Sequence, residues 1–184
     1  LFAMLFGYGL AMQVMKSEAK GTSFSRLAVR RLLILLGIGC IHAFLIWSGD
    51  ILITYALAGL CLIVLMKLKP LWLIIIAAVL YLIPNGLLTG LVYFMTKIAP
   101  DQSVLYTAIQ KVEESAVAYS QGSWFDVFGQ RLADWLYMQG YGLNVVLILC
   151  TILPLLMLGS AAAKLRLIER ASELKLFWII TVII

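Results

Sequence analysis

The fold of this chain is decided by residues 30–50, which read RRLLILLGIGCIHAFLIWSGD. Two arginines open this stretch, a long apolar run follows, and Asp50 stands just past its end. The run is long enough to cross a bilayer, because a membrane-spanning helix needs about 20 mostly apolar residues at 1.5 Å each. His42, the only histidine of the chain, falls inside the run. An ionisable side chain at membrane depth is costly, so His42 is a candidate for function.

The composition of the whole chain is that of a membrane protein. Of its 184 residues, 64% are hydrophobic and 12% are charged, and the mean hydropathy is +1.04. An ordinary soluble domain carries about 25% charged residues. This excess of apolar surface predicts an all-α polytopic transmembrane helix bundle and argues against a soluble fold of this length.

Working outward from residues 30–50, we expect four complete spans and two truncated ones. The complete spans are residues 27–47, 51–66, 71–95 and 141–163, and the truncated ones are 1–15 and 176–184. Pro84-Asn85-Gly86 interrupts the third complete span and predicts a broken or kinked helix there. The chain begins and ends inside apolar runs, so we expect residues 1–184 to form a single integral-membrane domain internal to a longer protein.

Loop charges predict the orientation. Loops 16–31, 67–70 and 164–175 hold eleven Lys and Arg against three Glu, whereas the alternate loops hold three Lys and Arg against six Asp and Glu. Excess Lys and Arg marks the cytoplasmic side, so loop 97–140 is expected outside. The net charge of +5 is thereby explained without a nucleic-acid partner. Membrane lipid is the expected partner.

Loop 97–140 is expected to contain two amphipathic helices. The first covers residues 101–119, and the second follows Ser123, which reads as an N-cap supported by Asp126. Aromatic residues including Trp124 and Trp135 recur at helical spacing in the second helix. This helix would lie along the outer membrane interface or form a lid on the bundle, and the sequence leaves both open.

His42 and Asp50 are the candidate catalytic residues. His42 would act as a general base or proton relay, with Asp50 fixing its tautomer, if the Ser48-Gly49 segment folds back. Thr54 and Tyr55 could join such a network. The alternatives are a histidine that only ties helices together and an aspartate that only caps the following helix.

Further candidates are assigned to binding. Tyr55, Asn85 and Trp47 are candidate substrate contacts, although Trp47 also fits an interfacial aromatic belt. A basic cluster would bind an anionic group such as the phosphates of acyl-CoA, or would anchor the chain to anionic lipid; its members are Arg26, Arg30 and Arg31.

Other patterns point to packing and not to chemistry. Cys40, Cys61 and Cys150 lie singly in apolar runs, so we expect no disulfide framework and no metal site. No permanently bound cofactor is expected. The pairs Gly7/Gly9 and Gly37/Gly39 predict close helix packing.

Several blocks of the sequence resemble the YeiB-like family of predicted bacterial inner-membrane proteins. These blocks are LFGYG (5–9), RRLL (30–33), GCIH (39–42), WSGDIL (47–52), YALAG (55–59) and FGQRLADW (128–135). The family is grouped with membrane acyltransferases of the heparan-alpha-glucosaminide acetyltransferase type. The resemblance implies a multi-pass inner-membrane protein that passes an acyl group from cytosolic acyl-CoA to a sugar or lipid acceptor, with a histidine implicated. The Arg-Gly element and membrane Asn of the family's first span have no counterpart in this chain.

Three hypotheses follow. The first is the acyltransferase, with acyl-CoA as donor substrate. The second is a membrane transporter of a small solute or lipid, in which His42 couples proton movement. The third is a structural subunit of a membrane complex. A homo-oligomer is compatible with all three.

Overall fold

The computed structural model describes residues 1–21, 24–98, 102–140 and 142–170. Within these residues the chain forms seven α-helices and two π-helical turns, without a strand, which confirms the all-α expectation. The elements are α1 (Phe2–Ala19), α2 (Phe24–Ile41), η1 (His42–Ile46), α3 (Leu52–Leu65), α4 (Pro70–Ile98), α5 (Gln102–Gln121), α6 (Trp124–Trp135), η2 (Leu136–Gly140) and α7 (Gly142–Lys164).

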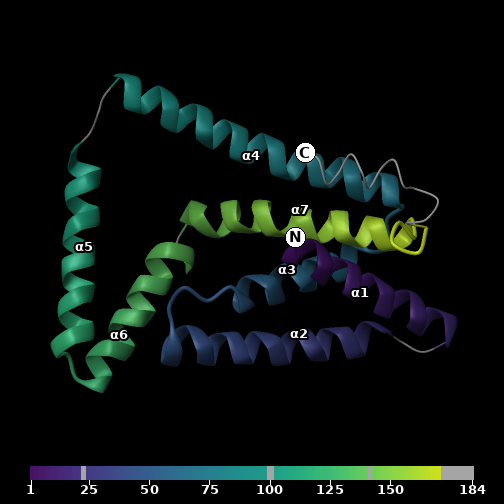
Figure 1. Ribbon diagram of the computed structural model, residues 1–184, viewed down its shortest axis with the longest axis horizontal. Coiled ribbons are helices and arrows are strands. Elements are labelled where there is room, and N and C mark those ends of the chain that lie inside the picture. Colours follow the sequence, from purple (N-terminus) through teal and green to yellow (C-terminus); the bar gives the residue numbers. More distant parts are fainter. Residues whose placement is uncertain (22–23, 99–101, 141, 171–184) are drawn as a thin grey trace.

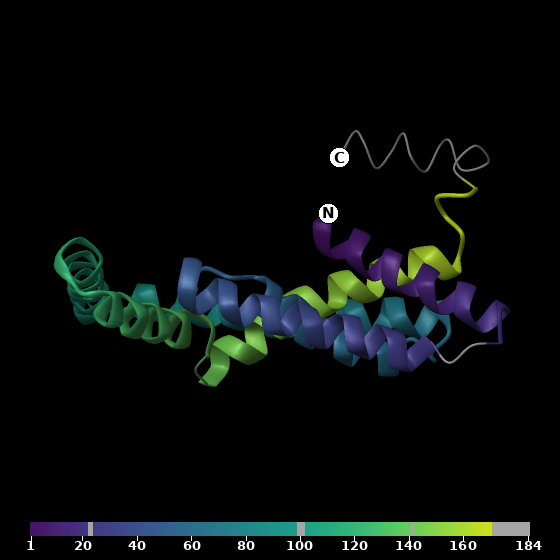
Figure 2. The ribbon, with the colours of Figure 1, turned by 90° about the horizontal axis from the view of Figure 1, so that it is seen from below.

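The helices of the bundle lie side by side, and the α5–α6 hairpin covers one end of them (Figure 1). Helix α7 is central, because it packs against α1, α3 and α4, while α2 packs against α3. Turned by 90°, the molecule shows α5 and α6 extending beyond the bundle at the same end (Figure 2). The α2–α3 connection is found at this end as well.

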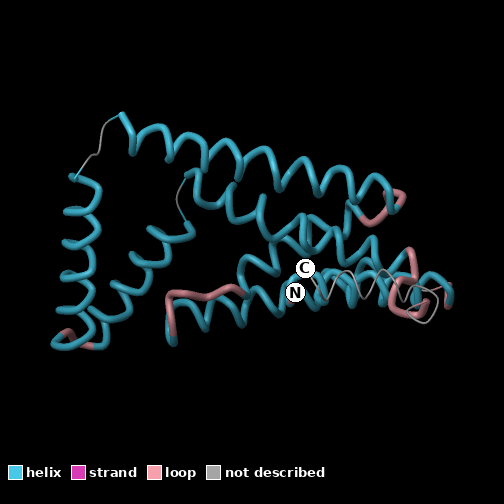
Figure 3. The backbone as a smooth tube through the Cα atoms, turned by 45° about the horizontal axis from the view of Figure 1, so that its top comes forward, coloured by secondary structure: helices cyan, strands magenta, loops and turns pink. Residues whose placement is uncertain are grey.

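The opposite end gathers the basic segments. The α1–α2 and α3–α4 connections and the end of α7 meet there, as the tube trace shows (Figure 3). Lys164, at the end of α7, donates hydrogen bonds to the carbonyl oxygens of Met66 and Leu68, the latter at 2.7 Å. These carbonyls follow the last turn of α3, where helical partners are missing. The packing of the helices therefore places the basic segments at one end of the bundle and the α2–α3 connection with the α5–α6 hairpin at the other.

In the part of the chain that the structure describes, three helical segments are long and apolar enough to cross a membrane: Arg26–Ile46, Pro70–Lys97 and Asn144–Lys164. Leu52–Leu65 is apolar but shorter. This differs from the expected four complete spans, because α3 has only 14 residues, which at 1.5 Å each gives about 21 Å against a hydrocarbon core of about 30 Å. The expected truncated span 176–184 lies outside the described residues.

Helix α4 decides between the two forms expected at Pro84-Asn85-Gly86. These residues do not break α4, since the helix is continuous from Pro70 to Ile98, and a kink is the form that agrees with this continuity. Proline removes one backbone donor, but polar side chains bind carbonyls around it. Asn85 Nδ2 donates to the oxygen of Tyr81 at 2.8 Å, and Thr89 Oγ1 donates to the oxygen of Asn85 at 2.8 Å.

Glycines set the closest helix contacts. A Cβ on Gly7 would lie 2.0 Å from the carbonyl oxygen of Leu156, and one on Gly159 would lie 1.9 Å from that of Met4, so α1 and α7 touch backbone to backbone. A Cβ on Gly39 would meet Ile53 N at 2.8 Å, where α2 crosses α3. The packing role of Gly7 and Gly39 is confirmed. Gly9 and Gly37, by contrast, have nothing within 4 Å of such a Cβ.

Candidate functional site

His42 stands where helix α2 changes its winding. The α-helix ends at Ile41, and residues 42–46 continue as one π-helical turn, closed by a hydrogen bond of 2.8 Å from Trp47 N to His42 O. Such turns are rare and often occur at functional sites. The His42 side chain is 32% exposed, so its ring is held by the protein but not sealed off.

The segment after η1 folds back and brings Asp50 to the histidine. Asp50 Oδ1 lies 2.8 Å from His42 Nδ1. A Cβ on Gly49 would lie 2.6 Å from the Trp47 ring, so only glycine leaves room for the indole in this turn. The Trp47 ring stands edge-on to the His42 ring, with centroids 6.4 Å apart. The contact that the catalytic assignment requires is therefore present.

The Asp50 side chain is completely buried, and each of its oxygens has a partner. Oδ2 accepts a hydrogen bond of 2.9 Å from Ile53 N in the first turn of α3. Asp50 thus satisfies an N-terminal N–H of α3 while it contacts His42, so the capping and pairing roles coexist. A carboxylate only accepts hydrogen bonds, so Nδ1 of the neutral imidazole carries the proton and Nε2 keeps a lone pair.

Nε2 of His42 is the ring nitrogen that Asp50 leaves unengaged. No residue in the described part of the chain hydrogen-bonds to it. A half-exposed imidazole nitrogen with a free lone pair, whose opposite nitrogen is held by a buried carboxylate, has the geometry of a general base. Protonation would produce an imidazolium beside the Asp50 carboxylate, which stabilises it.

Gln139, which the sequence analysis did not single out, clamps the backbone of the same site. It lies in η2, and its Nε2 donates to Asp50 O at 2.7 Å. Its Oε1 accepts from Thr54 Oγ1 at 3.1 Å. Two π-helical turns thus supply the site, one carrying His42 and the other Gln139. No sequence spacing relates residues 89 positions apart.

Helix α6 packs on η1 beside the site. Arg131 donates a hydrogen bond to the carbonyl oxygen of Leu45, one of the unpaired carbonyls at the end of α2 and η1. The rings of Phe44 and Trp135 meet edge to face, 5.8 Å apart. The second half of α6 is therefore a lid on the bundle.

The first half of α6 remains uncovered. Ser123 caps it, and the expected reciprocal bonds with Asp126 are both present, which confirms the capping box. These bonds, from the Ser123 hydroxyl and backbone, lower the pKa of Asp126. Trp124 and Phe125 are 63% and 78% exposed. The second half of α6 thus packs on the bundle as a lid, whereas a membrane-interface position of the exposed first half stays a prediction.

A polar cluster joins α5 to α6. Asp134 accepts hydrogen bonds from Tyr119 at 2.7 Å, Ser115 at 3.1 Å and Gln130 at 2.8 Å. Burial, followed by the contact with Asp134, raises the pKa of the Tyr119 hydroxyl. The cluster borders a groove of about 480 Å³ between the two helices. It fixes α5 on α6 and so holds the lid as one unit.

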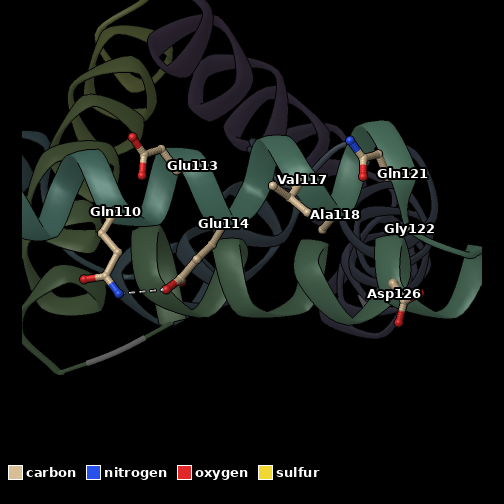
Figure 4. Close-up of a pocket in the computed structure, with 8 residues that line it drawn as sticks. All are labelled: Gln110, Glu113, Glu114, Val117, Ala118, Gln121, Gly122 and Asp126. Atoms are coloured by element: carbon tan, nitrogen blue, oxygen red, sulfur yellow. Dashed lines mark hydrogen bonds between the residues drawn. The ribbon is translucent and has the colours of Figure 1, made fainter.

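A larger hollow on the other side of α5 has no part in this site. Glu113, Glu114 and Asp126 line it, but it is wide open (Figure 4). Gln110 Nε2 donates to Glu114 Oε1 at 3.2 Å, which already occupies one of these carboxylates. Within the described ranges, no three His, Cys, Asp or Glu side chains come together in a way that could hold a metal ion.

The arginine cluster does not share the histidine site. Arg26 and Arg30 are exposed, and Arg31 donates a hydrogen bond to Gln13 Oε1. Eleven residues of helix separate Arg31 from His42, which is about 16 Å along the axis. The arginines can meet a ligand only from the basic end of the bundle.

Tyr55 and Asn85 also lie apart from the pair. Tyr55 is only 7% exposed, and its ring contacts those of Phe2 and Phe6 at centroid distances of 5.4 and 5.6 Å. Asn85 faces α7, where its Oδ1 accepts a hydrogen bond of 3.4 Å from Thr151 Oγ1. Of the three candidate substrate contacts, only Trp47 lies against His42.

Comparison with known proteins gives two similarities. The chain is 36% identical to the uncharacterized protein YxaH of Bacillus subtilis (strain 168), in a match that covers 100% of this chain and 48% of YxaH. It is 43% identical over 60 residues to the uncharacterized protein YeiB of Escherichia coli (strain K12), covering 33% of this chain and 14% of YeiB. The chain therefore spans about half of YxaH and a smaller part of YeiB.

No family profile matches the chain. No solved structure matches it either. The similarity to YeiB agrees with the resemblance found in the sequence blocks, and the apolar helices indicate a membrane protein. Neither relative's description mentions an activity.

Proposed function

We propose that this chain is part of an inner-membrane acyltransferase in which His42 is the general base. One observation carries the proposal: a histidine at the end of an apolar helix has Nδ1 bound to a buried carboxylate and Nε2 unengaged by the described residues. A purely structural histidine between helices would be expected to use both nitrogens.

The proposed orientation follows from the charges at the two ends of the bundle. The basic end faces the cytosol, and the end with His42, Asp50 and the α5–α6 lid faces outward. In this arrangement α2, α4 and α7 span the bilayer, and α3 completes a fourth, short crossing. Residues 1–15 would belong to a further span.

The chemistry assigns one task to each group. Acyl-CoA is the proposed donor, and its phosphates bind near Arg26, Arg30 and Arg31. His42 Nε2 takes the proton from an acceptor hydroxyl or amine while that group attacks the acyl carbonyl carbon. The new C–O or C–N bond replaces the C–S bond, and the imidazolium returns its proton to the departing thiolate. Asp50 stabilises the imidazolium in between.

The test is acyl transfer by the full-length protein in membranes, measured as labelled acyl group passed from acyl-CoA to a lipid or sugar acceptor. His42→Gln should reduce transfer by about 10²–10⁴-fold, the usual contribution of a general base. Arg131→Lys keeps a donor for Leu45 O and serves as the control that transfer should survive. Full activity of His42→Gln would reject the proposal.

A transporter is the second candidate, and one contact favours it. Asn85 and Thr151 form a polar pair between the apolar helices α4 and α7, and buried polar groups in spans often mark a solute path. The test is pH-dependent solute flux in vesicles without an acyl donor. Flux that persists in Asn85→Leu would reject this path.

A further inference from the structure

A small pocket opens at the basic end of the bundle, where segments far apart in the sequence meet (Figure 3). It lies between the end of α1, the α3–α4 connection and the end of α7. Its volume is about 210 Å³, which is the space of about seven water molecules at about 30 Å³ each. The lining includes Val14, Met15, Glu18, Met66, Lys67 and Lys164.

Lys164 places a fixed ammonium group at the wall of this pocket. Its Nζ donates hydrogen bonds to the carbonyl oxygens of Met66 and Leu68. Met66 is only 6% exposed and lines the same pocket, so the bond to its carbonyl oxygen holds the ammonium group there. An ammonium group has three N–H donors, so one of them remains for a further acceptor.

The other two charged side chains of the lining are exposed and have no such partners. Neither the Glu18 carboxylate nor the Lys67 ammonium forms a hydrogen bond or an ion pair with a described residue. The Glu18 carboxylate is near enough to attract the Lys164 ammonium, yet the two do not form a salt bridge. Charges of both signs therefore surround the pocket without neutralising one another directly.

This combination of charges selects a ligand that carries both signs. A phosphate alone would be attracted by Lys67 and Lys164 but repelled by Glu18, and an amine alone would meet two ammonium groups. A group with a phosphate at one end and an ammonium at the other provides a partner for all three side chains.

The position of the pocket fits a lipid headgroup. It lies where α3 and α7 end, and the ends of membrane-spanning helices are at the depth of the headgroups. Basic pockets between helices at this depth bind lipid headgroups in other membrane proteins. The apolar side chains of Val14 and Met15 form part of the lining, where they can contact the carbon atoms of such a group.

We propose that this pocket binds a phosphoethanolamine group, carried by a membrane lipid or free in solution. Its phosphate accepts hydrogen bonds from Lys67 and Lys164, and its ammonium group donates to the Glu18 carboxylate. The space of about seven water molecules is close to the number of non-hydrogen atoms in this group. The site is at the end of the bundle opposite to His42 and does not rest on the proposed function.

The test measures which lipids the full-length protein retains when it is released from detergent micelles in native mass spectrometry. Phosphatidylethanolamine, phosphatidylglycerol and phosphatidylcholine with the same acyl chains are offered at equal concentrations. Wild type should retain phosphatidylethanolamine about fivefold over phosphatidylglycerol, the size expected of one charge contact near the surface. Phosphatidylcholine should be retained no better than phosphatidylglycerol, because its quaternary ammonium has no N–H to donate.

Two variants test the assigned contacts. Glu18→Gln keeps the size of the side chain and removes its charge, so the preference for phosphatidylethanolamine over phosphatidylglycerol should disappear. Lys67→Gln should lower the retention of phosphatidylethanolamine, because the phosphate loses a cation. Lys164 is left in place, since it also binds the carbonyls after α3. Glu113→Gln, at an exposed carboxylate on α5, is the matched control and should keep the wild-type preference.

Three results would overturn the proposal. Equal retention of phosphatidylethanolamine and phosphatidylglycerol by wild type would show that only the positive charge of this end attracts lipid. A preference that survives in Glu18→Gln would remove the carboxylate from the site, and equal retention of phosphatidylcholine would remove the hydrogen bond from the ammonium group.

Free phosphoethanolamine separates the two sources of the ligand. If it displaces the retained phosphatidylethanolamine, the headgroup alone is sufficient for binding. If the selective retention persists in its presence, the site binds the group as part of a lipid. Neither result depends on acyl transfer, so the failure of this proposal and of the proposed function are distinguishable.

Discussion

Replacing Asp50 with Asn should invert the tautomer of His42 while the fold survives. Asn keeps the shape of Asp but presents one acceptor and one donor. Its oxygen can still accept from Ile53 N, which now lies 2.9 Å from Oδ2, and its amide can donate to His42 Nδ1 across the present 2.8 Å. The imidazole proton then moves to Nε2, and the nitrogen that faces the acceptor becomes a donor.

The expected magnitudes follow from these two bonds. Both persist but lose their charge assistance, so the free energy of unfolding should fall by about 1 kcal/mol, the difference between charged and neutral hydrogen bonds. Asp50→Ala removes both and leaves His42 Nδ1 and Ile53 N–H without acceptors, at about 1–3 kcal/mol each. Transfer should fall by about 10⁴-fold in Asp50→Asn, as it does in a serine protease when the aspartate of the catalytic triad is replaced by asparagine.

Imidazole ¹⁵N shifts report the tautomer without any activity measurement, and the His42 signals are assigned by their loss in His42→Gln. Wild type should show a protonated Nδ1, and Asp50→Asn a protonated Nε2. Thermal unfolding in detergent gives the stability, with Glu113→Gln as a control at an exposed carboxylate. The reasoning fails if Asp50→Asn retains the Nδ1–H tautomer, or if it retains wild-type transfer with Nε2 protonated.

Three further predictions concern the bundle and the lid. Gly159→Ala should destabilise the α1–α7 crossing by about 1–3 kcal/mol in thermal unfolding, because its Cβ would lie 1.9 Å from the carbonyl oxygen of Met4. Gly9→Ala has open space around its Cβ and should not lower stability, so equal losses in the two variants would contradict the packing. Burial and the contact with the Asp134 carboxylate raise the pKa of the Tyr119 hydroxyl. The contribution of Tyr119 to the stability of the α5–α6 lid is therefore present below the ordinary pKa near 10 and is lost as the pH rises through the raised pKa. Limited proteolysis of the lid should increase in that pH range, and Tyr119→Phe should abolish this pH dependence. Ser123→Ala should cost about 0.5–2 kcal/mol of α6 stability and return the lowered pKa of Asp126 toward its ordinary value, which carboxylate ¹³C titration would detect; an unchanged pKa would contradict the capping contact.

Parts of the site could be predicted because they are local in the chain. Only seven residues lie between His42 and Asp50, so their contact depends mainly on how the Ser48-Gly49 segment folds back. The capping of α6 by Ser123 is local in the same way. The packing of Tyr55 could not be predicted in the same way, because the orientation of a residue on a buried helix depends on which neighbour it faces, and α1 supplies two phenylalanine rings there.

Gln139, Arg131 and Trp135 illustrate what remained hidden. Each contacts a residue more than 80 positions away, and each is an ordinary residue type for an amphipathic helix at a membrane surface. The π-helical winding at His42 was hidden as well. Only the docking of α6 on the end of α2 shows that Arg131 binds the Leu45 carbonyl of that turn and that the Trp135 ring meets Phe44 edge to face.

The sequence by itself determined the apolar helices, the division of charge between alternate loops, and a histidine inside an apolar run, because hydrophobic length and charge are properties of contiguous residues. The tertiary structure decided which nitrogen of His42 is held, that Gln139 binds the Asp50 backbone, and that helix α6 packs against the turn that carries His42. Those features arise where α3, α6, η2 and α7 meet, and contacts between segments distant in the chain leave no periodic trace in it.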